Sequence, residues 1–573
     1  MSIFAGIYSP RELCLKTEQK KERDDILKHI SRTGGDPLIY DRPGFFLATI
    51  FSDSTRGMRI SKGVCFVNGR SYYNSTKDKY VAPSTELECA IDMCRAGDAS
   101  SYLTGSRGAF SLCYYNENEH VLTLGTDRYG SKPIYIAKSG ECYFFASAIR
   151  ILEKISGLNL KFNIAKACEK LLMGYHLGDH TPYDNVTLLR GGECSQIAKD
   201  KWTRLRYHKW GQGGPNRDDP KNWETNSYDI FKEAVAIRAA DAEKPLAMLS
   251  GGLDSRCIAT VLSEVSAGLN TVTFESKGRK DDKIALAYAK ALGVSNHLIH
   301  KPYTQPNVEA LHELSRLMQS GENPSISTQR IFSGDGGSVG VGFCYVNQEL
   351  VDLVAKGDLA GLARSIFSDR LPKRLFRKSD YDDIKQHLLK SLDDEIRDID
   401  VDDPYRFVHF FFLNTDQRCH LHWFHEDIDL FKMEFETPFM DSLFCEYLYS
   451  IPGEHFMYHK FYHKWVECFP AVFKSVPWQT YPKHLPCPIA FDESLPDQWT
   501  RTRNDRFKRG DGPLTELELN LLSRNFPPKS FNRLFILQAA LLHRFRIRHF
   551  GNIFEIVNGI MKYRGSSSSI GLK

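Results

Sequence analysis

In the first 210 residues of the chain, apolar and polar positions form short runs that favour strands. Residues 109–115 and 120–125 are apolar and β-prone, and the polar residues 116–119 between them predict a hairpin turn. Residues 143–147 predict another short strand, whereas residues 84–96 and 165–173 have helical spacing. This mixture predicts an α+β layered domain with mainly antiparallel sheets.

The pattern changes in the second part of the chain, where strands and helices alternate. Residues 245–249, 269–274 and 295–300 predict short strands, and residues 255–265 and 282–292 between them have helical spacing. This order is typical of a parallel sheet with right-handed crossovers. The second part is therefore predicted to have an α/β fold.

The two parts are separated by a segment rich in glycine and proline, residues 211–220, where neither helix nor strand is expected. We predict a first domain over residues 1–210 and a second over 221–490, the latter mainly helical from about residue 380 to 469. A basic extension, helical in patches, follows over 491–573. Its four serines at 566–569 are expected to be disordered.

Composition excludes several classes of protein. Of 573 residues, 42% are hydrophobic and 25% are charged, which is ordinary for a globular chain. Lys and Arg number 75 against 71 Asp and Glu, and a net charge of +4 argues against a nucleic-acid-binding protein. The sequence contains no apolar run of about 18 residues, so no transmembrane helix is predicted. The first residues lack the basic and apolar segments of a signal peptide.

The 14 cysteines are scattered, and no C-x-x-C pair occurs. Zinc sites usually need closer pairs, so we expect buried or incidental free thiols. Free thiols favour a reducing compartment, and a cytoplasmic location is expected.

The hexapeptide Ser250–Ser255, Ser-Gly-Gly-Leu-Asp-Ser, lies directly between a predicted strand and a predicted helix. Its two glycines permit a tight turn and let backbone N–H groups approach an oxyanion, and the helix adds its positive end. Ser250 and Ser255 add hydroxyl donors. Phosphate alone would repel Asp254, so we expect this carboxylate to hold Mg²⁺ against the phosphates.

This pattern predicts a site for ATP and Mg²⁺, although it lacks the lysine of a Walker motif. The alternative is an ordinary Ser/Gly-rich turn with a capping aspartate.

The hexapeptide resembles the pyrophosphate-loop motif of N-type ATP pyrophosphatases, and four other segments resemble the asparagine synthetase-like family. These segments are N-G-R-S-Y-Y-N at 68–74, D-R-Y-G-S-K-P-I-Y at 127–135, F-A-S at 145–147 and P-F-M-D at 438–441. Ordered matches over residues 1–490 are more specific than any single motif. The resemblance implies a class II glutamine amidotransferase domain with an Ntn-type αββα sandwich. A synthetase domain with the α/β fold of the pyrophosphate-loop ATPases and a helical C-terminal part would follow.

The resemblance also implies a nucleotide site made of the hexapeptide, its neighbours and a second glycine-rich loop. The expected cofactor-binding residues are Leu249, Ser250, Gly251, Gly252, Leu253, Ser255, Phe274, Ser333, Gly334, Gly336 and Gly337. Asp254 is the expected metal ligand and a catalytic residue. In the second loop, Ser338 and Val339 replace the family's Asp-Glu pair, and Asp335 is expected to compensate. A surface loop is the alternative.

A cation is expected near the pyrophosphate. Lys460 and Lys464 fit the spacing of the family's K-x-x-L-[RK] segment and lie at i and i+4 of a helix, as a polyphosphate clamp needs. A solvated basic face is the alternative. Asp281 and Asp282 resemble the acid that opens the family's second helix, or are simple helix N-terminal charges. His420 is expected to be structural.

Two departures concern the glutaminase half. The family begins with Cys-Gly-Ile, and its N-terminal cysteine is the nucleophile, whereas the matching triplet here is Ala5-Gly6-Ile7. Ser2 does not fit this register. Arg70 stands where the family has a glutamate that pairs with the substrate amine. We therefore expect a retained scaffold without glutaminase activity.

The resemblance implies an ATP-dependent ligase that adenylates a carboxylate, releases pyrophosphate and passes the acyl group to an amine or ammonia. Its substrates would be small molecules or peptides in polysaccharide or natural-product biosynthesis. Two alternatives stay open: a lasso-peptide macrolactam synthetase, and a degenerate ATP-binding scaffold with a partner biosynthetic protein. A further alternative is that the basic residues 501–573 dock an acidic partner or a membrane surface.

Overall fold

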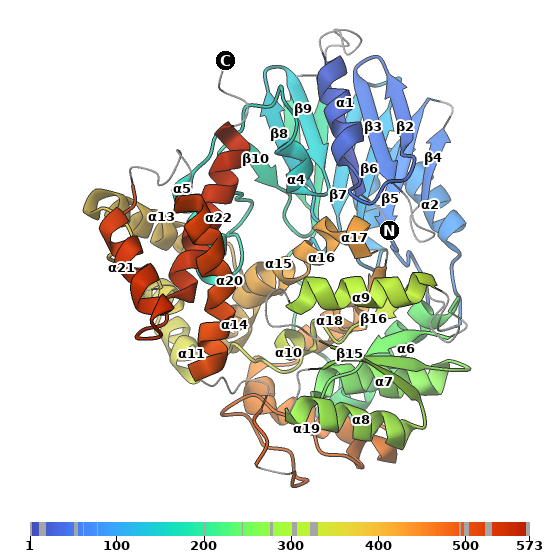
Figure 1. The fold of residues 1–573 in the computed structure, drawn as a ribbon. Helices are drawn as coiled ribbons and strands as arrows, with labels where there is room; N and C mark the ends of the chain where they lie inside the picture. The colour runs from blue at the N-terminus through green and yellow to red at the C-terminus, as the bar shows by residue number, and fades with distance from the viewer. Residues whose placement is uncertain are drawn as a thin grey trace.

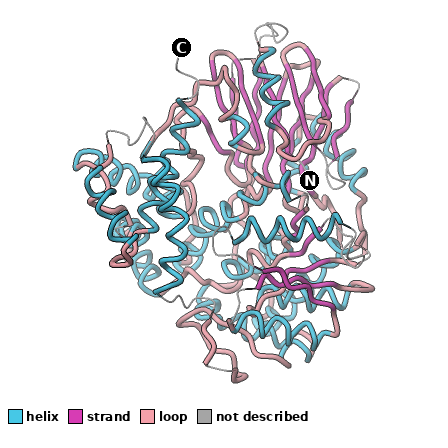
Figure 2. Tube along the Cα trace, in the orientation of Figure 1, coloured by secondary structure: helices cyan, strands magenta, loops and turns pink. Residues whose placement is uncertain are grey.

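Three sheets organise the chain in the computed structural model (Figures 1 and 2). Two are six-stranded, and the third has five strands. The structure describes residues 3–10, 19–50, 56–60, 62–76, 78–199, 201–242, 244–275, 279–300, 306–320, 330–368, 370–431, 433–491, 494–497, 503–521 and 530–568.

The first 210 residues form two antiparallel sheets that pack face to face. One has the order β10-β8-β9-β1-β3-β2, and the other has the order β12-β11-β7-β6-β5-β4. The strands of the first sheet are β1 Ile3–Tyr8, β2 Leu38–Arg42, β3 Phe45–Ile50, β8 Tyr135–Ser139, β9 Cys142–Ala146 and β10 Val186–Leu188. Those of the second are β4 Arg56–Ile60, β5 Gly63–Gly69, β6 Phe110–Asn116, β7 Val121–Thr126, β11 Glu193–Ala198 and β12 Lys201–Arg206.

Helices cover the outer face of each sheet, so the layers run helix, sheet, sheet, helix. They are α1 Lys20–His29 and α4 Ile149–Leu152 on the first sheet, and α2 Pro83–Arg95 and α3 Ala99–Thr104 on the second. The alternation of β1 shows the reason: Ile3, Ala5 and Ile7 face the helices, whereas Phe4 and Tyr8 face the other sheet. The expected αββα order is thus present, and the predicted hairpin is the β6–β7 pair.

The second part contains the predicted parallel sheet, in the order β15-β14-β13-β16-β17. Its strands are β13 Leu246–Met248, β14 Asn270–Glu275, β15 Ser295–His300, β16 Arg330–Phe332 and β17 Glu434–Glu436. Figure 1 shows α9 Pro306–Ser320 on one side of this sheet, and α7 Leu253–Val265 and α8 Lys280–Leu292 on the other. Right-handed crossovers require this placement, because the chain first moves outward from β13 to β15 and then returns to β16.

The other α-helices of the described chain lie outside the three sheets and the helices named above. They are α5 Ile164–Met173, α6 Trp223–Ala239, α10 Gly337–Gly340, α11 Gln348–Ala355, α12 Leu359–Phe367, α13 Lys378–Arg397, α14 Pro404–Phe412, α15 Arg418–His420, α16 His422–Glu426, α17 Ile428–Phe431, α18 Ser442–Ser450, α19 Lys460–Trp465, α20 Arg503–Leu521, α21 Arg533–Arg544 and α22 Gly551–Ser568. Five residues between α14 and α15, Leu413–Gln417, form a π-helical turn.

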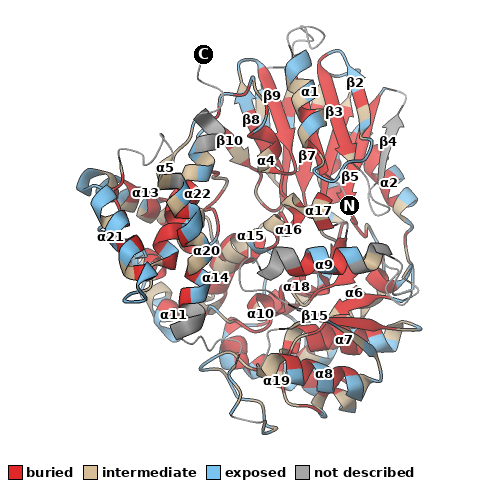
Figure 3. Ribbon diagram, in the orientation of Figure 1, coloured by how far each residue is buried: buried red, intermediate tan, exposed pale blue. Residues whose placement is uncertain are grey.

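The C-terminal extension packs back on the first part of the chain. Tyr183 donates a hydrogen bond to the Tyr563 carbonyl of α22, and Gly559 of α22 lies against Leu171 of α5. Figure 3 shows exposed positions along α21. Leu534, Leu537 and Leu541 of this helix are exposed. The disorder expected for the serines at 566–569 stays a prediction: α22 is assigned through Ser568, and Ser569 lies outside the described residues.

Other expectations can be compared directly. Residues 211–219 form no helix or strand, as expected, but they are held in place: the Asn216 N–H donates to the Ser450 carbonyl, and Tyr447 donates to Asp218. The cysteines of the described chain are free thiols, as expected. No helix in the described ranges is both long and apolar enough to cross a membrane. The domain boundaries at 210, 221 and 490 stay predictions.

A buried ion cluster joins the two parts of the chain at Asp441, the last residue of the P-F-M-D segment. Arg107, from the first part, donates to both carboxylate oxygens at 3.1 Å, and Arg238 of α6 donates at 2.8 Å. Arg107 also pairs with Glu233, and Arg238 lies 3.7 Å from Glu436. Asp441 is fully buried and accepts bonds from the first N–H groups of α18 as its N-cap. The two arginines hold the pKa of Asp441 below its usual value although burial raises it.

We predict that Asp441→Asn lowers the free energy of unfolding by about 3–5 kcal/mol, because it leaves two buried arginines without their shared anion. Urea-induced unfolding of the variant and the wild type measures the difference. Asp92→Asn is the matched control, since Asp92 is exposed and its pair with Arg95 spans 3.7 Å; its effect should stay below about 0.5 kcal/mol. Equal effects of the two substitutions would contradict the role of the cluster.

Candidate active site

The order of the parallel sheet places two glycine-rich loops side by side. The chain moves from β13 to one side of the sheet and later returns to the other, so the loops after β13 and β16 leave the sheet at its switch point. Ligands of open α/β sheets bind at this place, outside the carboxyl ends of the strands. The loop after β13 is the hexapeptide 250–255, and the loop after β16 covers residues 333–337.

The hexapeptide loop is held by its own serines. The Ser250 N–H donates to the Ser255 hydroxyl at 3.0 Å, and the two hydroxyl groups lie 2.9 Å apart. The Gly251 N–H donates to Asp281 at 2.8 Å, and the Gln479 amide donates to the same carboxylate oxygen at 2.9 Å. Asp281, at the start of α8, therefore fixes this loop and does more than supply helix N-terminal charge.

Glycine stands at the two positions of this loop for different structural reasons. Neither takes a positive φ, so the turn itself does not require glycine. A Cβ on Gly251 would lie 2.9 Å from both Asp281 Oδ1 and Gln479 Nε2, which excludes a side chain. A Cβ on Gly252 would meet only Ser250 Oγ, at 3.5 Å. Gly252 therefore leaves open space beside the first turn of α7, where N–H groups favour an anion.

The second loop packs tightly on the first. A Cβ on Gly334 would lie 2.7 Å from the Ser255 nitrogen, and one on Gly337 would lie 2.6 Å from Asp254 Oδ1. Gly336 has φ +96°, a left-handed conformation that favours glycine. Glycines at these positions thus let the two backbones meet.

Asp254 lies in the first turn of α7 and is held by two hydroxyl groups. Ser338 donates to Oδ2, and Tyr462 of α19 donates to Oδ1 at 2.6 Å. Burial and the nearby Asp335 charge nevertheless raise the pKa of Asp254 to about 6. The raised pKa indicates that no neighbouring cation of the described chain compensates the negative charge of this carboxylate. A hard cation such as Mg²⁺ prefers carboxylate oxygens as ligands.

Asp335 faces His420 across the same space. Their atoms Oδ1 and Nε2 are 3.5 Å apart, and Ser333 donates a hydrogen bond to Asp335. The hydrogen bond and the charge of Asp335 raise the pKa of His420, and the imidazole holds the pKa of Asp335 below its usual value although burial raises it. His420 ends α15, the short helix that directly follows the π-helical turn, and such turns are frequent at functional sites.

Both loops line one cavity of 430 Å³. The expected residues on its wall are Leu249, Ser250, Asp254, Ser255, Phe274, Ser333, Gly334, Asp335 and Gly336. Gly251, Gly252, Leu253 and Gly337 belong to the two loops but do not line it.

Acidic groups dominate the charge of the cavity wall. Asp254, Asp281, Asp335 and Asp416 contribute carboxyl groups, His420 contributes an imidazole, and no Lys or Arg of the described chain lines it. A polyphosphate could enter only with compensating cations, and the carboxylates are suitable ligands for Mg²⁺. The residues present therefore fit a magnesium–nucleotide complex.

Lys460 and Lys464 lie elsewhere. They line a separate cavity of 650 Å³ together with Trp223, His455 and Leu485. Residues two apart on a helix point in nearly opposite directions, and Tyr462 between the two lysines is the residue that reaches Asp254. Their position does not support the expected polyphosphate clamp.

The residues expected at a glutaminase centre are buried. Ala5 lies inside β1 between β3 and β9 and has no exposed surface. Arg70 is 4% exposed and pairs with Glu86 at 3.4 Å and with Asp241 at 3.2 Å. Its guanidinium would repel a positively charged substrate amine. Ser2 lies outside the described residues.

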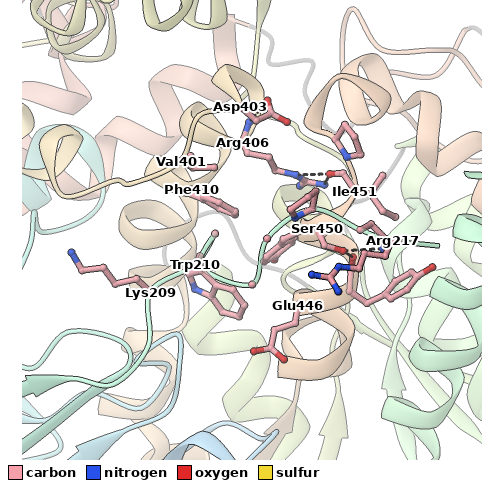
Figure 4. A pocket seen from close by; sticks show the side chains of 18 of the residues that line it. Lys209, Trp210, Arg217, Val401, Asp403, Arg406, Phe410, Glu446, Ser450 and Ile451 are labelled. Atoms are coloured by element: carbon pink, nitrogen blue, oxygen red, sulfur yellow. Dashed lines mark hydrogen bonds between the residues drawn. The ribbon is translucent and has the colours of Figure 1, made fainter. Parts of the chain in front are cut away.

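A third cavity, of 1070 Å³, lies where the linker meets α14 and α18 (Figure 4). Trp210 and Arg217 line it with Phe410 and Glu446, and Arg406 donates to the Ile451 carbonyl at 3.0 Å. Neither glycine-rich loop contributes to this cavity.

Several residues of the site were not expected from the sequence. No role was assigned to Tyr462, Ser338 or Asp416 from the sequence, and His420 was expected to be structural. Ser338 had one usable signal, because it occupies the position of the family's acid and still reaches Asp254.

Comparison with solved structures gives weak matches. One is titled as the allosteric regulatory enzyme of purine biosynthesis, with 11% identity, a TM-score of 0.25, and coverage of 54% of this chain and 82% of that one. Another is a glutamine phosphoribosylpyrophosphate amidotransferase from Bacillus subtilis, with 12% identity, a TM-score of 0.23, and coverage of 59% and 77%.

Comparison with known sequences is more specific. The sequence model of the glutamine amidotransferase domain matches residues 75–208, and that of asparagine synthase matches residues 227–333. Asparagine synthetase (glutamine-hydrolyzing) 1 of Bacillus subtilis is 24% identical over 294 residues, which is 51% of this chain and 44% of that protein. A relative from Methanocaldococcus jannaschii with an asparagine synthetase name is 26% identical over 193 residues, 32% of this chain and 37% of its own length. The matched segments thus span less than half of these relatives. The two domain matches in this order, together with these relatives, support a relationship to the asparagine synthetase-like family.

Proposed function

We propose that the protein is an ATP-dependent amide-bond ligase that adenylates a carboxylate and passes the acyl group to an amine or ammonia. The observation that carries this proposal is the pair of glycine-rich loops at the switch point, enclosing a cavity with four carboxyl groups. The family match to asparagine synthase supports the reaction class. The substrates would be a small-molecule or peptide carboxylate and a free amine or ammonia.

In this proposal, the serine hydroxyls of the hexapeptide and the first turn of α7 bind the phosphates. Leu249 and Phe274 provide an apolar wall beside them. Asp254 would hold Mg²⁺, which supplies positive charge against the phosphates as pyrophosphate leaves. Ser338 and Tyr462 keep the Asp254 carboxylate turned toward the cavity.

Two bonds form in sequence. A carboxylate oxygen of the substrate attacks the α-phosphorus, and the bond from that phosphorus to the bridging oxygen of pyrophosphate breaks. The amine then attacks the acyl carbon, and AMP leaves with the electrons of the C–O bond. The attacking nitrogen must lose a proton, so a base is needed in the cavity.

We assign this base to His420. Asp335 faces Nε2, which leaves Nδ1 as the nitrogen that accepts the proton. His420 is suitably placed, because it lines the cavity and its side chain is 52% exposed. Asp335 thus orients the imidazole and stabilises the imidazolium that forms, a role different from the metal-side compensation expected from sequence.

We also propose that the first domain has no glutaminase activity. The position of the family's nucleophile is Ala5, which has no thiol and lies buried inside a strand. Arg70, where the family has glutamate, is engaged with two carboxylates. The sandwich then serves as a scaffold that contacts the ligase half through Arg70 and Arg107.

The first prediction from the proposed function concerns Asp254. We expect Asp254→Asn to reduce Mg²⁺-dependent exchange of pyrophosphate into ATP by at least about 100-fold, because the metal loses a charged ligand. The exchange is measured with a panel of carboxylates, and Mg²⁺-dependent binding of a non-hydrolysable ATP analogue is measured in parallel. Asp352→Asn is the control, since Asp352 is exposed and bonds only locally to Gln348. Cleavage of ATP to ADP, or analogue binding without any dependence on Mg²⁺ or Asp254, would refute the proposal.

The second prediction concerns pH. Neutral imidazole is the active form of the base, so kcat at constant free-amine concentration should rise as pH rises through the raised pKa of His420. Asp335→Asn removes the charge that favours imidazolium, so the rise should move to lower pH. His420→Gln should lower kcat by about 10²–10⁴-fold and remove the rise.

His29→Gln is the control for this experiment, because His29 lies at the end of α1 in the sandwich. An unchanged midpoint in Asp335→Asn, or an unchanged rate in His420→Gln, would exclude His420 as the base.

The third prediction concerns the nitrogen donor. With glutamine as the sole donor, we expect no glutamate release, whereas ammonium or a free amine should support amide formation. Glutamate is measured directly over the time course of the ligase reaction. Glutamate release that disappears in Ser2→Ala would overturn the assignment of an inactive glutaminase domain.

A further inference from the structure

A group of metal-ligating side chains lies far from the glycine-rich loops in sequence, between the sandwich part and the helical part of the chain. Glu169 lies on α5, His180 lies in the segment that follows it, and His387 lies on α13. Their ligating atoms all lie within 4.8 Å of one another. None of the three lines the cavity of the candidate active site.

Both histidines approach the same oxygen of one buried carboxylate. His180 Nδ1 lies 2.9 Å and His387 Nε2 lies 3.0 Å from Glu169 Oε1. The other oxygen, Oε2, accepts the Leu177 N–H at 3.1 Å. This leaves Oε1 and two ring nitrogens directed at one point.

The surroundings combine a buried anion with open access. Glu169 has no exposed surface, whereas the side chains of His180 and His387 are 28% and 26% exposed. The two rings are inclined by 28°, with centroids 5.8 Å apart, and both are partly exposed to solvent. Lys166, whose charge acts on His180, is paired with Asp184 at 3.0 Å.

The segment that carries His180 is fixed in place. Besides the bond from Leu177 to Glu169, the His180 N–H donates to the Leu177 carbonyl, and Asp179 pairs with Arg204 at 2.6 Å. A site whose ligands are held before the ion arrives loses little conformational entropy on binding.

We propose that Glu169, His180 and His387 bind a divalent transition-metal ion of the Zn²⁺ type, which ties α5 to α13. Two imidazole nitrogens and one carboxylate oxygen suit Zn²⁺ and related ions, whereas Mg²⁺ prefers oxygen ligands. The O···N separations of 2.9 and 3.0 Å are slightly shorter than the edges of a tetrahedron with Zn–ligand distances of about 2.0–2.1 Å, so only a small outward shift of the rings is needed. Water would complete the coordination.

Such an ion would act as a cross-link between distant segments. Residues 169 and 387 are carried by helices that pack on each other, and α22 packs on α5 as well. An ion bound to the folded protein alone stabilises it by mass action. This site is independent of the proposed ligase reaction, so either assignment can fail without the other.

The test measures metal content of the full-length protein after dialysis against metal-free buffer and one addition of Zn²⁺. We expect about one retained equivalent in the wild type, a rise in Tm on its addition, and visible absorption bands when Co²⁺ replaces it. His180→Ala and His387→Ala should each lose the retained metal and the Tm rise.

His387→Gln separates a ligand from a simple hydrogen-bond donor, because glutamine keeps an N–H group but is a poor zinc ligand. It should fold with a Tm near that of the metal-free wild type and still retain no Zn²⁺. His455→Ala is the matched control, since His455 pairs with Glu454 at 3.8 Å without a second histidine; it should keep the metal.

Three outcomes would overturn the proposal. A wild type that retains no metal would show that the group is a hydrogen-bonded clamp. Zn²⁺ retained equally by His180→Ala and His387→Ala would mean binding elsewhere. Retention of Zn²⁺ by His387→Gln would show that His387 is not a ligand.

Discussion

The carboxylate of Asp441 is the constraint on which the position of the candidate site depends. It lies fully buried between Arg107 and Arg238, which come from the two parts of the chain. The segment directly before it, Phe439 and Met440, packs against Gly336 of the second loop. That loop in turn meets the hexapeptide at Gly334 and Gly337. One ion cluster thereby fixes the joint between the domains and the distance between the two loops.

The geometry of the cavity follows from backbone contacts more than from side chains. Gly251, Gly334 and Gly337 are required because other atoms occupy the place of a Cβ, whereas Gly252 faces open space. The hydroxyls of Ser338 and Tyr462 then orient Asp254, and the π-helical turn before α15 brings Asp416 and His420 to the opposite wall. Polar groups from five separate segments therefore meet around one small space.

The sequence predicts the strands and their pairing best where the periodicity is strong. The β6–β7 hairpin and the β13–α7–β14–α8–β15 run follow directly from apolar alternation and helical spacing. The hexapeptide is predicted because strand, glycines and helix stand in the order that anion binding needs.

Other features depend on information that no local pattern contains. The direction of Lys460 and Lys464 follows from the start of α19, which comes after Tyr458 and His459 in left-handed conformations, so spacing alone does not determine which way they point. The role of His420 depends on a π-helical turn and on Asp335, 85 positions away in the chain. The joining role of Asp441 requires Arg107, which lies in the other domain.

The excess of acidic groups on the cavity wall has a consequence for the order of events. In the described part of the chain, no lysine or arginine side chain lines the wall to receive a bare tetra-anion. Free nucleotide would meet repulsion from several acids at short range, and a metal-neutralised complex would not. Under the proposed function, capture of the nucleotide and capture of its cation would thus be a single step.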